Sequence, residues 1–396
     1  MATLLLLLIY VAFISLGLPD ALLGAGWPVM QPELGVPFSA AGLLQLIISG
    51  GTIVSSMFAG QLLARFGTGK LTAFSVALTA IALFGFAAAP AFGWLILMAV
   101  PLGLGAGAVD AALNAYVANH YASRHMSWLH SFWGVGALGG PLLLSILFAE
   151  QLGWRLGYSS IAVFQVVLVI VLLLAIPLWS RVKVRRDVDQ PSNESERPLS
   201  LSNALRIKGV GLAMVVFLFY CGLELTMGLW GASYLYQTRG LAAADAAYWV
   251  SIFYASITLG RFATGFGSYR FSNLAMIRAG SLVIAVGVLM MWLPLSLPFS
   301  LCGYVLIGLG CAPIFPCMLH ETPARFGQAS SQSIMGYQMA FAYIGATALP
   351  PLFGLVAGMT SISYLPYFLV VYGLSILFGS EALRRLVPPK TAGLVR

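Results

Sequence analysis

The chain has 396 residues, of which 60% are hydrophobic and only 8% carry a charge. About a quarter of the residues of a soluble domain are charged, so this composition excludes an ordinary soluble protein, and the apolar content excludes a disordered one. The formal net charge of +8 would indicate a nucleic-acid partner only if the basic residues gathered on one soluble face, which they do not. The sequence therefore predicts an integral membrane protein of the all-α class.

Twelve stretches are long and apolar enough to cross a bilayer as helices, for which about 20 apolar residues are needed. The predicted spans are residues 4–29, 38–63, 71–90, 93–118, 128–149, 158–180, 209–236, 246–268, 274–294, 297–319, 331–358 and 362–386. These runs lack the alternating polarity of a transmembrane β-barrel. The first has no basic residues before it and contains Pro19, Asp20 and Trp27, so we expect a retained helix and not a cleaved signal peptide.

The basic residues predict the orientation, because Lys and Arg near the spans stay on the cytoplasmic side. With the N-terminus inside, all Lys and Arg except Arg155 and Arg239 fall in cytoplasmic segments, Arg261 and Arg325 included. We therefore expect a multi-pass protein of the plasma membrane with both termini cytoplasmic. The short loops favour a bacterial inner membrane.

Residues 181–208 form a charged stretch rich in Ser and Pro without periodicity, which is typical of a linker. It separates a predicted N-terminal six-helix bundle at 1–180 from a C-terminal one at 209–396. An offset of 205 residues aligns Gly17-Leu18 with Gly222-Leu223, Gly26 with Gly231, Gly60 with Gly265, Arg65-Phe66 with Arg270-Phe271, and Gly103-Leu104-Gly105 with Gly308-Leu309-Gly310. Two parallel six-helix repeats are the arrangement of a transporter whose site lies between its halves near the midplane.

The predicted loop between the second and third spans reads GQLLARFGTGK from Gly60 to Lys70. It resembles the signature loop of the major facilitator superfamily, and the twelve spans and the linker are similar to that family throughout the chain. The resemblance implies the major facilitator fold, with conformational roles for Gly60, Arg65, Gly67 and, in the second half, Arg270. The family's usual loop Asp is replaced by Ala64, which puts the charge relay of that loop in doubt.

Three further segments resemble the fucose permease-like branch of the superfamily, whose members include proton-coupled sugar symporters. They are Leu129–Gly136, Gly140-Pro141 and Ala312–Pro316. The resemblance implies that helices 1, 4, 7 and 10 line a central cavity, and that acids in helices 1 and 4 serve proton coupling and sugar recognition.

Three acidic residues, Asp20, Asp110 and Glu224, lie inside predicted spans, whereas acids such as Glu321 are placed in inner loops. A charge at mid-bilayer costs about 3 kcal/mol or more, so such a residue faces a cavity, has a partner or takes up a proton. The predicted spans place no Lys or Arg at the depth of these three acids. We therefore expect them to carry the coupled protons.

Asn114 follows Asp110 at spacing i, i+4 and shares its helix face, and His130 is predicted at about the depth of Asn114. Because His titrates near neutral pH, the three residues could relay a proton to the inner side. Alternatively, Asn114 and His130 join helices 4 and 5 by hydrogen bonds.

Polar and aromatic side chains inside the spans are candidates for a sugar site, since rings stack on the apolar face of a pyranose and amides bind its hydroxyls. The candidates are Asp20, Asn114, Gln45, Trp27, Trp133, Tyr254, Tyr337 and Gln338. Trp and Tyr are also common as anchors at bilayer interfaces. The glycine-rich runs at 103–107 and 134–136 indicate close helix packing.

The sequence contains no G-x-S-x-G or H-E-x-x-H motif and no paired cysteine spacing, so we expect no enzyme, cofactor or metal site. The leading hypothesis is secondary active transport, in which a monomer in the lipid bilayer moves a small polar solute, a sugar or sugar-like compound, together with protons. Proton-driven export of drugs or metabolites and a non-transporting sensor are the alternatives.

Overall fold

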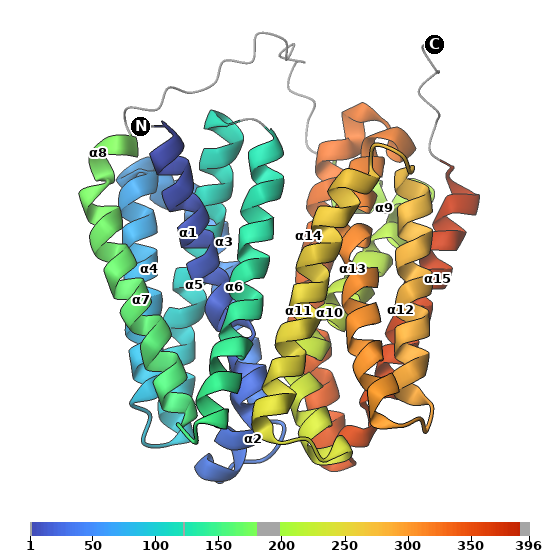
Figure 1. The fold of residues 1–396 in the computed structure, drawn as a ribbon. Helices are drawn as coiled ribbons and strands as arrows, with labels where there is room; N and C mark the ends of the chain where they lie inside the picture. Colours follow the sequence, from blue (N-terminus) through green and yellow to red (C-terminus); the bar gives the residue numbers. More distant parts are fainter. Residues whose placement is uncertain (1, 122, 180–198, 389–396) are drawn as a thin grey trace. The chain divides into compact units, whose positions relative to one another are not determined.

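The computed structural model describes residues 2–121, 123–179 and 199–388. Within these ranges the chain forms fifteen α-helices and one short 3-10 helix, and no β-strand (Figure 1). The predicted all-α class is confirmed.

The first part of the chain contains eight helices. They are α1 (Ala2–Asp20), α2 (Leu22–Leu34), α3 (Ala40–Phe66), α4 (Thr68–Ala87), α5 (Phe92–His120), α6 (Ser123–Ala149), α7 (Trp154–Leu174) and α8 (Ile176–Trp179). The predicted spans are confirmed to within a few residues, except that the first is interrupted at Ala21 and the sixth at Ala175. Pro19 lies just before this break, and a proline inside a helix removes one backbone hydrogen bond and crowds the preceding turn.

The later part contains the remaining helices. They are α9 (Leu201–Arg206), α10 (Val210–Arg239), α11 (Ala243–Gly267), α12 (Asn273–Trp292), α13 (Leu297–Phe326), α14 (Gln328–Met359), the 3-10 helix η1 (Ile362–Tyr364) and α15 (Leu365–Leu386). Each predicted span again corresponds to one long helix.

Helix α9 corrects part of the predicted linker. Residues 181–198 of that linker lie outside the described residues, but 201–206 form a helix where no structure was expected. The Ser200 hydroxyl accepts a hydrogen bond from the backbone N–H of Asn203, which caps the helix. Ala204 is buried against Val210, Met214 and Ile334. Tertiary packing therefore stabilises a helix too short to persist alone.

Eleven segments in the described residues are long and apolar enough to cross a membrane, the first running through α1 and α2 as Thr3–Leu34. The chain is therefore a multi-pass membrane protein. Helix α11, which matches the remaining predicted span, has 25 residues but is not among the eleven. It carries Asp245 and Arg261, which lower its hydropathy.

Contacts divide the chain into two compact units. Unit 1 comprises Met1–Asp187, Gly228–Tyr254 and Gly354–Ile362; unit 2 comprises Val188–Met227, Ala255–Phe353 and Ser363–Arg396. Figure 1 shows α2 continuing α1 downward, α3 to α7 running alternately up and down, and α10 to α15 alternating in the same way. The domain boundaries expected from the linker remain a prediction.

Glycines bring the helices of unit 1 into backbone contact. A Cβ on Gly103 or Gly107 of α5 would collide with backbone atoms of α3, and one on Gly136 of α6 would lie 2.9 Å from the Cα of Gly17 in α1. This closeness lets short side chains bind backbone across the interface: Thr52 Oγ1 donates to the Gly103 carbonyl at 3.2 Å. The close packing predicted from the glycine-rich runs is confirmed.

Unit 2 uses the same construction between α12 and α13. A Cβ on Gly280 would lie 2.6 Å from the Gly310 carbonyl oxygen, and one on Gly303 would lie 2.7 Å from the Gly287 carbonyl oxygen. Small residues at such contacts supply the van der Waals packing that joins helices in lipid, where the hydrophobic effect gives no preference for helix over lipid.

Replacing Gly136 by Ala should separate α1 from α6, because the added methyl group meets backbone atoms that cannot rotate away. We expect the free energy of unfolding to fall by about 1–3 kcal/mol, typical of overpacked sites. Thermal unfolding in detergent would measure this loss. Gly50→Ala in α3 is the matched control, since nothing lies within 4 Å of the added atom; an equal loss in both variants would contradict the close-contact explanation.

Candidate functional site

The predicted signature loop at 60–70 is mostly helical, which corrects the sequence interpretation. Helix α3 continues to Phe66 and α4 begins at Thr68, so Gly67 alone separates them, with φ at +73°. That left-handed conformation favours glycine because it has no Cβ. Arg65 is exposed and lies 5.3 Å from the Phe66 ring centroid. Conformational roles for Gly60, Arg65, Gly67 and Arg270 remain predictions.

Asp20 and Trp133 meet in unit 1. Asp20 is the last residue of α1 and Trp133 belongs to α6; the indole Nε1 donates a hydrogen bond of 2.7 Å to Oδ2 of Asp20. The Asp20 residue is exposed. A carboxylate facing lipid is costly, so an exposed acid at this depth belongs beside water or a polar ligand.

Asp110 and Asn114 of α5 complete this group. The Asn114 amide donates to both the Asp110 carboxylate and the Asp110 carbonyl, each at 2.9 Å. Asp110 is also close enough to Asp20 to interact with it electrostatically. We call Asp20, Asp110, Asn114 and Trp133 the acid cluster. Its two carboxylates repel each other, and binding a proton relieves that repulsion.

Tyr254 lies beside the acid cluster within unit 1. Its ring meets that of Trp133 edge to face with centroids 6.4 Å apart. The structure thus brings five of the sequence candidates together. Two others in unit 1 have local partners: Gln45 donates to Ser49 Oγ on the same helix at 3.1 Å, and the buried Trp27 donates to the Phe38 carbonyl at 3.1 Å.

His130 is exposed, and its ring meets Phe13 edge to face at 5.9 Å. Asn114 is bonded to Asp110 as described above. A proton relay from Asp110 through Asn114 to His130 therefore remains a prediction, as does the alternative in which the two side chains only join helices.

Glu224 of α10 corrects the expectation that the buried acids have no basic neighbours. Its Oε1 lies 3.6 Å from Nη2 of Arg261 on α11, and the two side chains are 5% and 20% exposed. The sequence analysis placed Arg261 in a cytoplasmic segment. Arg261 instead lies inside α11, more than a turn before that helix ends at Gly267.

Tyr337 and Gln338 of α14 lie elsewhere in unit 2. The Tyr337 hydroxyl donates to the Leu199 carbonyl at 2.8 Å, which fastens the segment before α9. Gln338 is buried and accepts a hydrogen bond of 2.9 Å from Thr322. These bonds engage the Tyr337 hydroxyl and the Gln338 Oε1 atom. The part of both residues in a sugar site remains a prediction.

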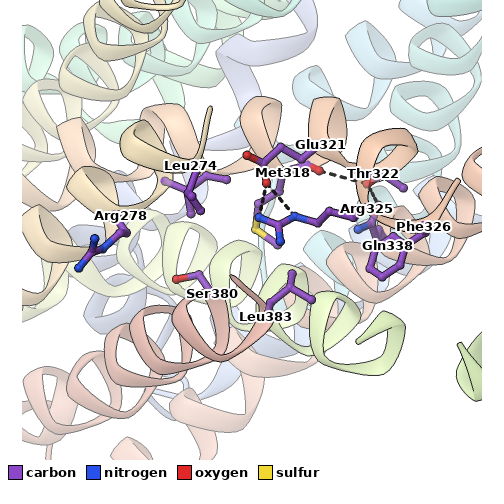
Figure 2. A pocket seen from close by; sticks show the side chains of 11 residues that line it. Leu274, Arg278, Met318, Glu321, Thr322, Arg325, Phe326, Gln338, Ser380 and Leu383 are labelled. Carbon is purple, nitrogen blue, oxygen red and sulfur yellow. Dashed lines mark hydrogen bonds and ion pairs between the residues drawn. The ribbon is translucent and has the colours of Figure 1, made fainter. Parts of the chain in front are cut away.

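Figure 2 shows a small pocket around Gln338, lined by residues of α12, α13, α14 and α15. Its space of about 10 Å³ has room for one water molecule and not for a sugar. In its lining, Arg325 Nε donates a hydrogen bond of 2.7 Å to Oε2 of Glu321, one helical turn earlier. The placement of Glu321 in an inner loop was wrong: both residues belong to α13 and are buried.

The Glu321–Arg325 pair has a counterpart in the first repeat. The offset of 205 relates Glu321 to Tyr116. In unit 2, Arg325 Nη1 donates a hydrogen bond of 2.6 Å to the carbonyl of Val387, which follows α15. In unit 1, the Tyr116 hydroxyl donates a hydrogen bond of 3.1 Å to the carbonyl of Trp179, the last residue of α8. In each repeat a hydrogen bond thus joins the fourth long helix, α5 or α13, to the chain at the end of the sixth span, at α8 or just after α15.

Sequence reasoning missed Arg261 and the Glu321–Arg325 pair. The i, i+4 spacing of Glu321 and Arg325 was a readable signal for an ion pair on one helix face. Arg261 lay inside the predicted span 246–268, but the assignment of basic residues to the cytoplasmic side concealed it.

The comparisons identify the family. Residues 9–350 match the Major Facilitator Superfamily, and the chain belongs to it. An MFS-type transporter of Yersinia pestis is 26% identical over 378 residues, covering 89% of this chain and 88% of that protein. The predicted superfamily is confirmed, and the fucose permease-like branch remains a prediction.

Two further proteins are similar. The glucose/mannose transporter GlcP of Bacillus subtilis is 28% identical over 233 residues, 57% of this chain and 56% of that protein. The crystal structure of the nucleoside transporter NupG superimposes with a TM-score of 0.74 at 14% identity, covering 95% of this chain and 98% of that one. The structural similarity to NupG confirms the predicted fold. The chain is thus a membrane transporter and not an enzyme, as predicted.

Arg325→Gln should destabilise unit 2, because it leaves Glu321 buried without its partner and the Val387 carbonyl without a donor. Breaking a buried pair costs about 3–5 kcal/mol. Arg385→Gln is the matched control, since Arg385 is 74% exposed and lies 3.5 Å from Glu381; such pairs contribute about 1 kcal/mol or less. Thermal unfolding would compare the two, and similar losses would contradict the distinction.

Proposed function

We propose that this transporter moves a small polar solute, a sugar or sugar-like compound, by proton-coupled alternating access. The acid cluster carries the proposal. Asp20 and Asp110 interact electrostatically inside unit 1, and their carboxylates accept hydrogen bonds from the neutral donors Trp133 and Asn114. Neutral donors hold a carboxylate in place without cancelling its charge, so a proton remains an effective counterion.

The solute class is supported by the chemistry beside the carboxylates. The rings of Trp133 and Tyr254 offer apolar faces, and Asn114 and Asp20 offer hydrogen-bonding groups. This combination suits a ring with hydroxyl groups. GlcP, a relative in sequence, is named a glucose/mannose transporter, and NupG, a relative in fold, is named a nucleoside transporter. Both names support the sugar-like class.

We further propose a bacterial inner membrane with cytoplasmic termini, supported by the distribution of Lys and Arg and by the Yersinia pestis relative. A monomer remains a prediction. Proton-driven export of drugs or metabolites and a non-transporting sensor are the competing functions. Each predicts a different result in the transport experiment below.

Sugars and polyols should drive protons into proteoliposomes that contain the purified protein and an internal pH dye. Asp20→Asn and Asp110→Asn should each abolish this proton movement, because an amide cannot carry a proton across. Asp245→Asn, at the exposed start of α11, should leave it unchanged.

Other outcomes identify the competing functions. Proton movement only with cationic amphiphiles would indicate an exporter, and solute binding without any flux would indicate a sensor. Proton-coupled flux that survives both Asp substitutions would contradict the assignment of the coupling groups.

Trp133→Phe should retain a ring beside Tyr254 but remove the donor to Asp20. A hydrogen bond to a charged group contributes about 1.5–3 kcal/mol, so we expect kcat/KM for uptake to fall by roughly tenfold to a hundredfold. Trp27→Phe is the control, because its indole bonds the Phe38 carbonyl inside the packed core. It should lower the thermal midpoint more than the rate, and the reverse pattern would contradict the proposed site.

A further inference from the structure

The Glu224–Arg261 ion pair holds an acid and a base together inside unit 2. The closest approach is 3.6 Å, which is longer than a hydrogen bond, and Arg261 is the more accessible partner at 20% against 5%. A buried ion pair of this kind need not stabilise a protein, because removing both charges from water is costly. A protein would keep such a pair if one of its two charges exchanged its partner for a charged solute during transport.

Three helices contribute titratable groups around this pair. Tyr220 and Cys221 share α10 with Glu224, Arg261 lies on α11 and Cys311 on α13, all close enough for electrostatic interaction. Phenol and thiol groups in apolar surroundings are neutral at physiological pH. Glu224 therefore supplies the full negative charge that balances Arg261.

Protonation of Glu224 would disturb this balance. The guanidinium remains charged at any physiological pH, so a neutral Glu224 would leave an unbalanced cation at depth in the membrane, which is costly. A neutral sugar cannot provide the missing charge, whereas a solute carboxylate can. Carboxylates also match the guanidinium geometry, since two parallel N–H groups bind both oxygens.

We propose that the transported solute carries a carboxylate, which replaces the Glu224 carboxylate as the partner of Arg261 when Glu224 takes up a proton in addition to those exchanged at Asp20 and Asp110. This inference rests on the proposed function and narrows its solute from sugar-like compounds to hydroxylated carboxylates such as sugar acids. The charges balance at each step: one O–H bond forms on Glu224 as one anion arrives, and both events reverse on release.

Matched sugars and sugar acids test the inference. Proteoliposomes would receive D-glucose or D-glucuronate, and D-galactose or D-galacturonate, and both labelled solute and internal pH would be followed. In the unmodified protein we expect the acids to be taken up at least about tenfold faster than the neutral sugars, each with inward proton movement. Arg261→Gln should remove this preference, and Arg261→Lys should retain part of it.

Further variants separate binding from coupling. Glu224→Gln imitates the protonated acid, so it should still bind the acids, measured as a ligand-induced rise of the thermal midpoint, while losing the pH dependence of that binding. Arg239→Gln, at the far end of α10, is the control and should keep the preference for acids. If Arg261→Gln does not fold, the double variant Glu224→Gln/Arg261→Gln removes both charges, and it should bind neither acid.

The outcomes distinguish this inference from the proposed function. Neutral sugars that move protons while the acids are inert would overturn the inference and leave the function standing. A preference for acids that persists without Arg261 would also overturn it. No proton movement with any of the four solutes, in a protein that remains folded, would count against both.

Discussion

A lipid bilayer offers no water to a buried polar group, so each such group must find its partner inside the protein or in the solute. Four acids of the long helices follow that constraint in different ways. Asp20 binds an indole, Asp110 binds an amide, and Glu224 and Glu321 each meet an arginine. The hydrogen-bond donors to the acids of unit 1 are neutral, whereas in unit 2 an arginine balances each acid while that acid is ionised.

Glycine makes these short polar contacts possible. Where Gly103 and Gly107 let α5 approach α3, the hydroxyls of Thr52 and Ser56 reach backbone carbonyls on the neighbouring helix, at 3.2 and 3.1 Å. The same closeness recurs between α12 and α13. Packing of this kind leaves little freedom inside a bundle, so we expect each unit to retain its own geometry during transport.

The two repeats share a framework and differ in charge. Tyr116 and Glu321 are equivalent by the 205-residue offset. Tyr116 itself joins α5 to the end of α8 by a hydrogen bond, whereas in the second repeat Arg325, the partner of Glu321, joins α13 to the residue after α15. The framework is thus kept with different chemistry. In our proposals, unit 1 exchanges protons through Asp20 and Asp110. In unit 2, Arg261 binds the solute's carboxylate while Glu224 is protonated.

Length and hydropathy alone predicted the positions of the long helices, because a membrane span must be apolar over about 20 residues whatever it packs against. The charge of Asp20, Asp110 and Glu224 at depth was equally readable, since one ionisable residue in an apolar run is conspicuous. The partners of these acids could not be predicted from the sequence. Arg261 was assigned to the cytoplasm by a rule about loops, and Glu321 by the expected end of a helix that continues to Phe326. Trp133 meets Asp20, and Arg261 meets Glu224, across helices that the sequence places but does not orient. Helix rotation and contact are decided by packing between distant segments, and only the tertiary structure contains that information.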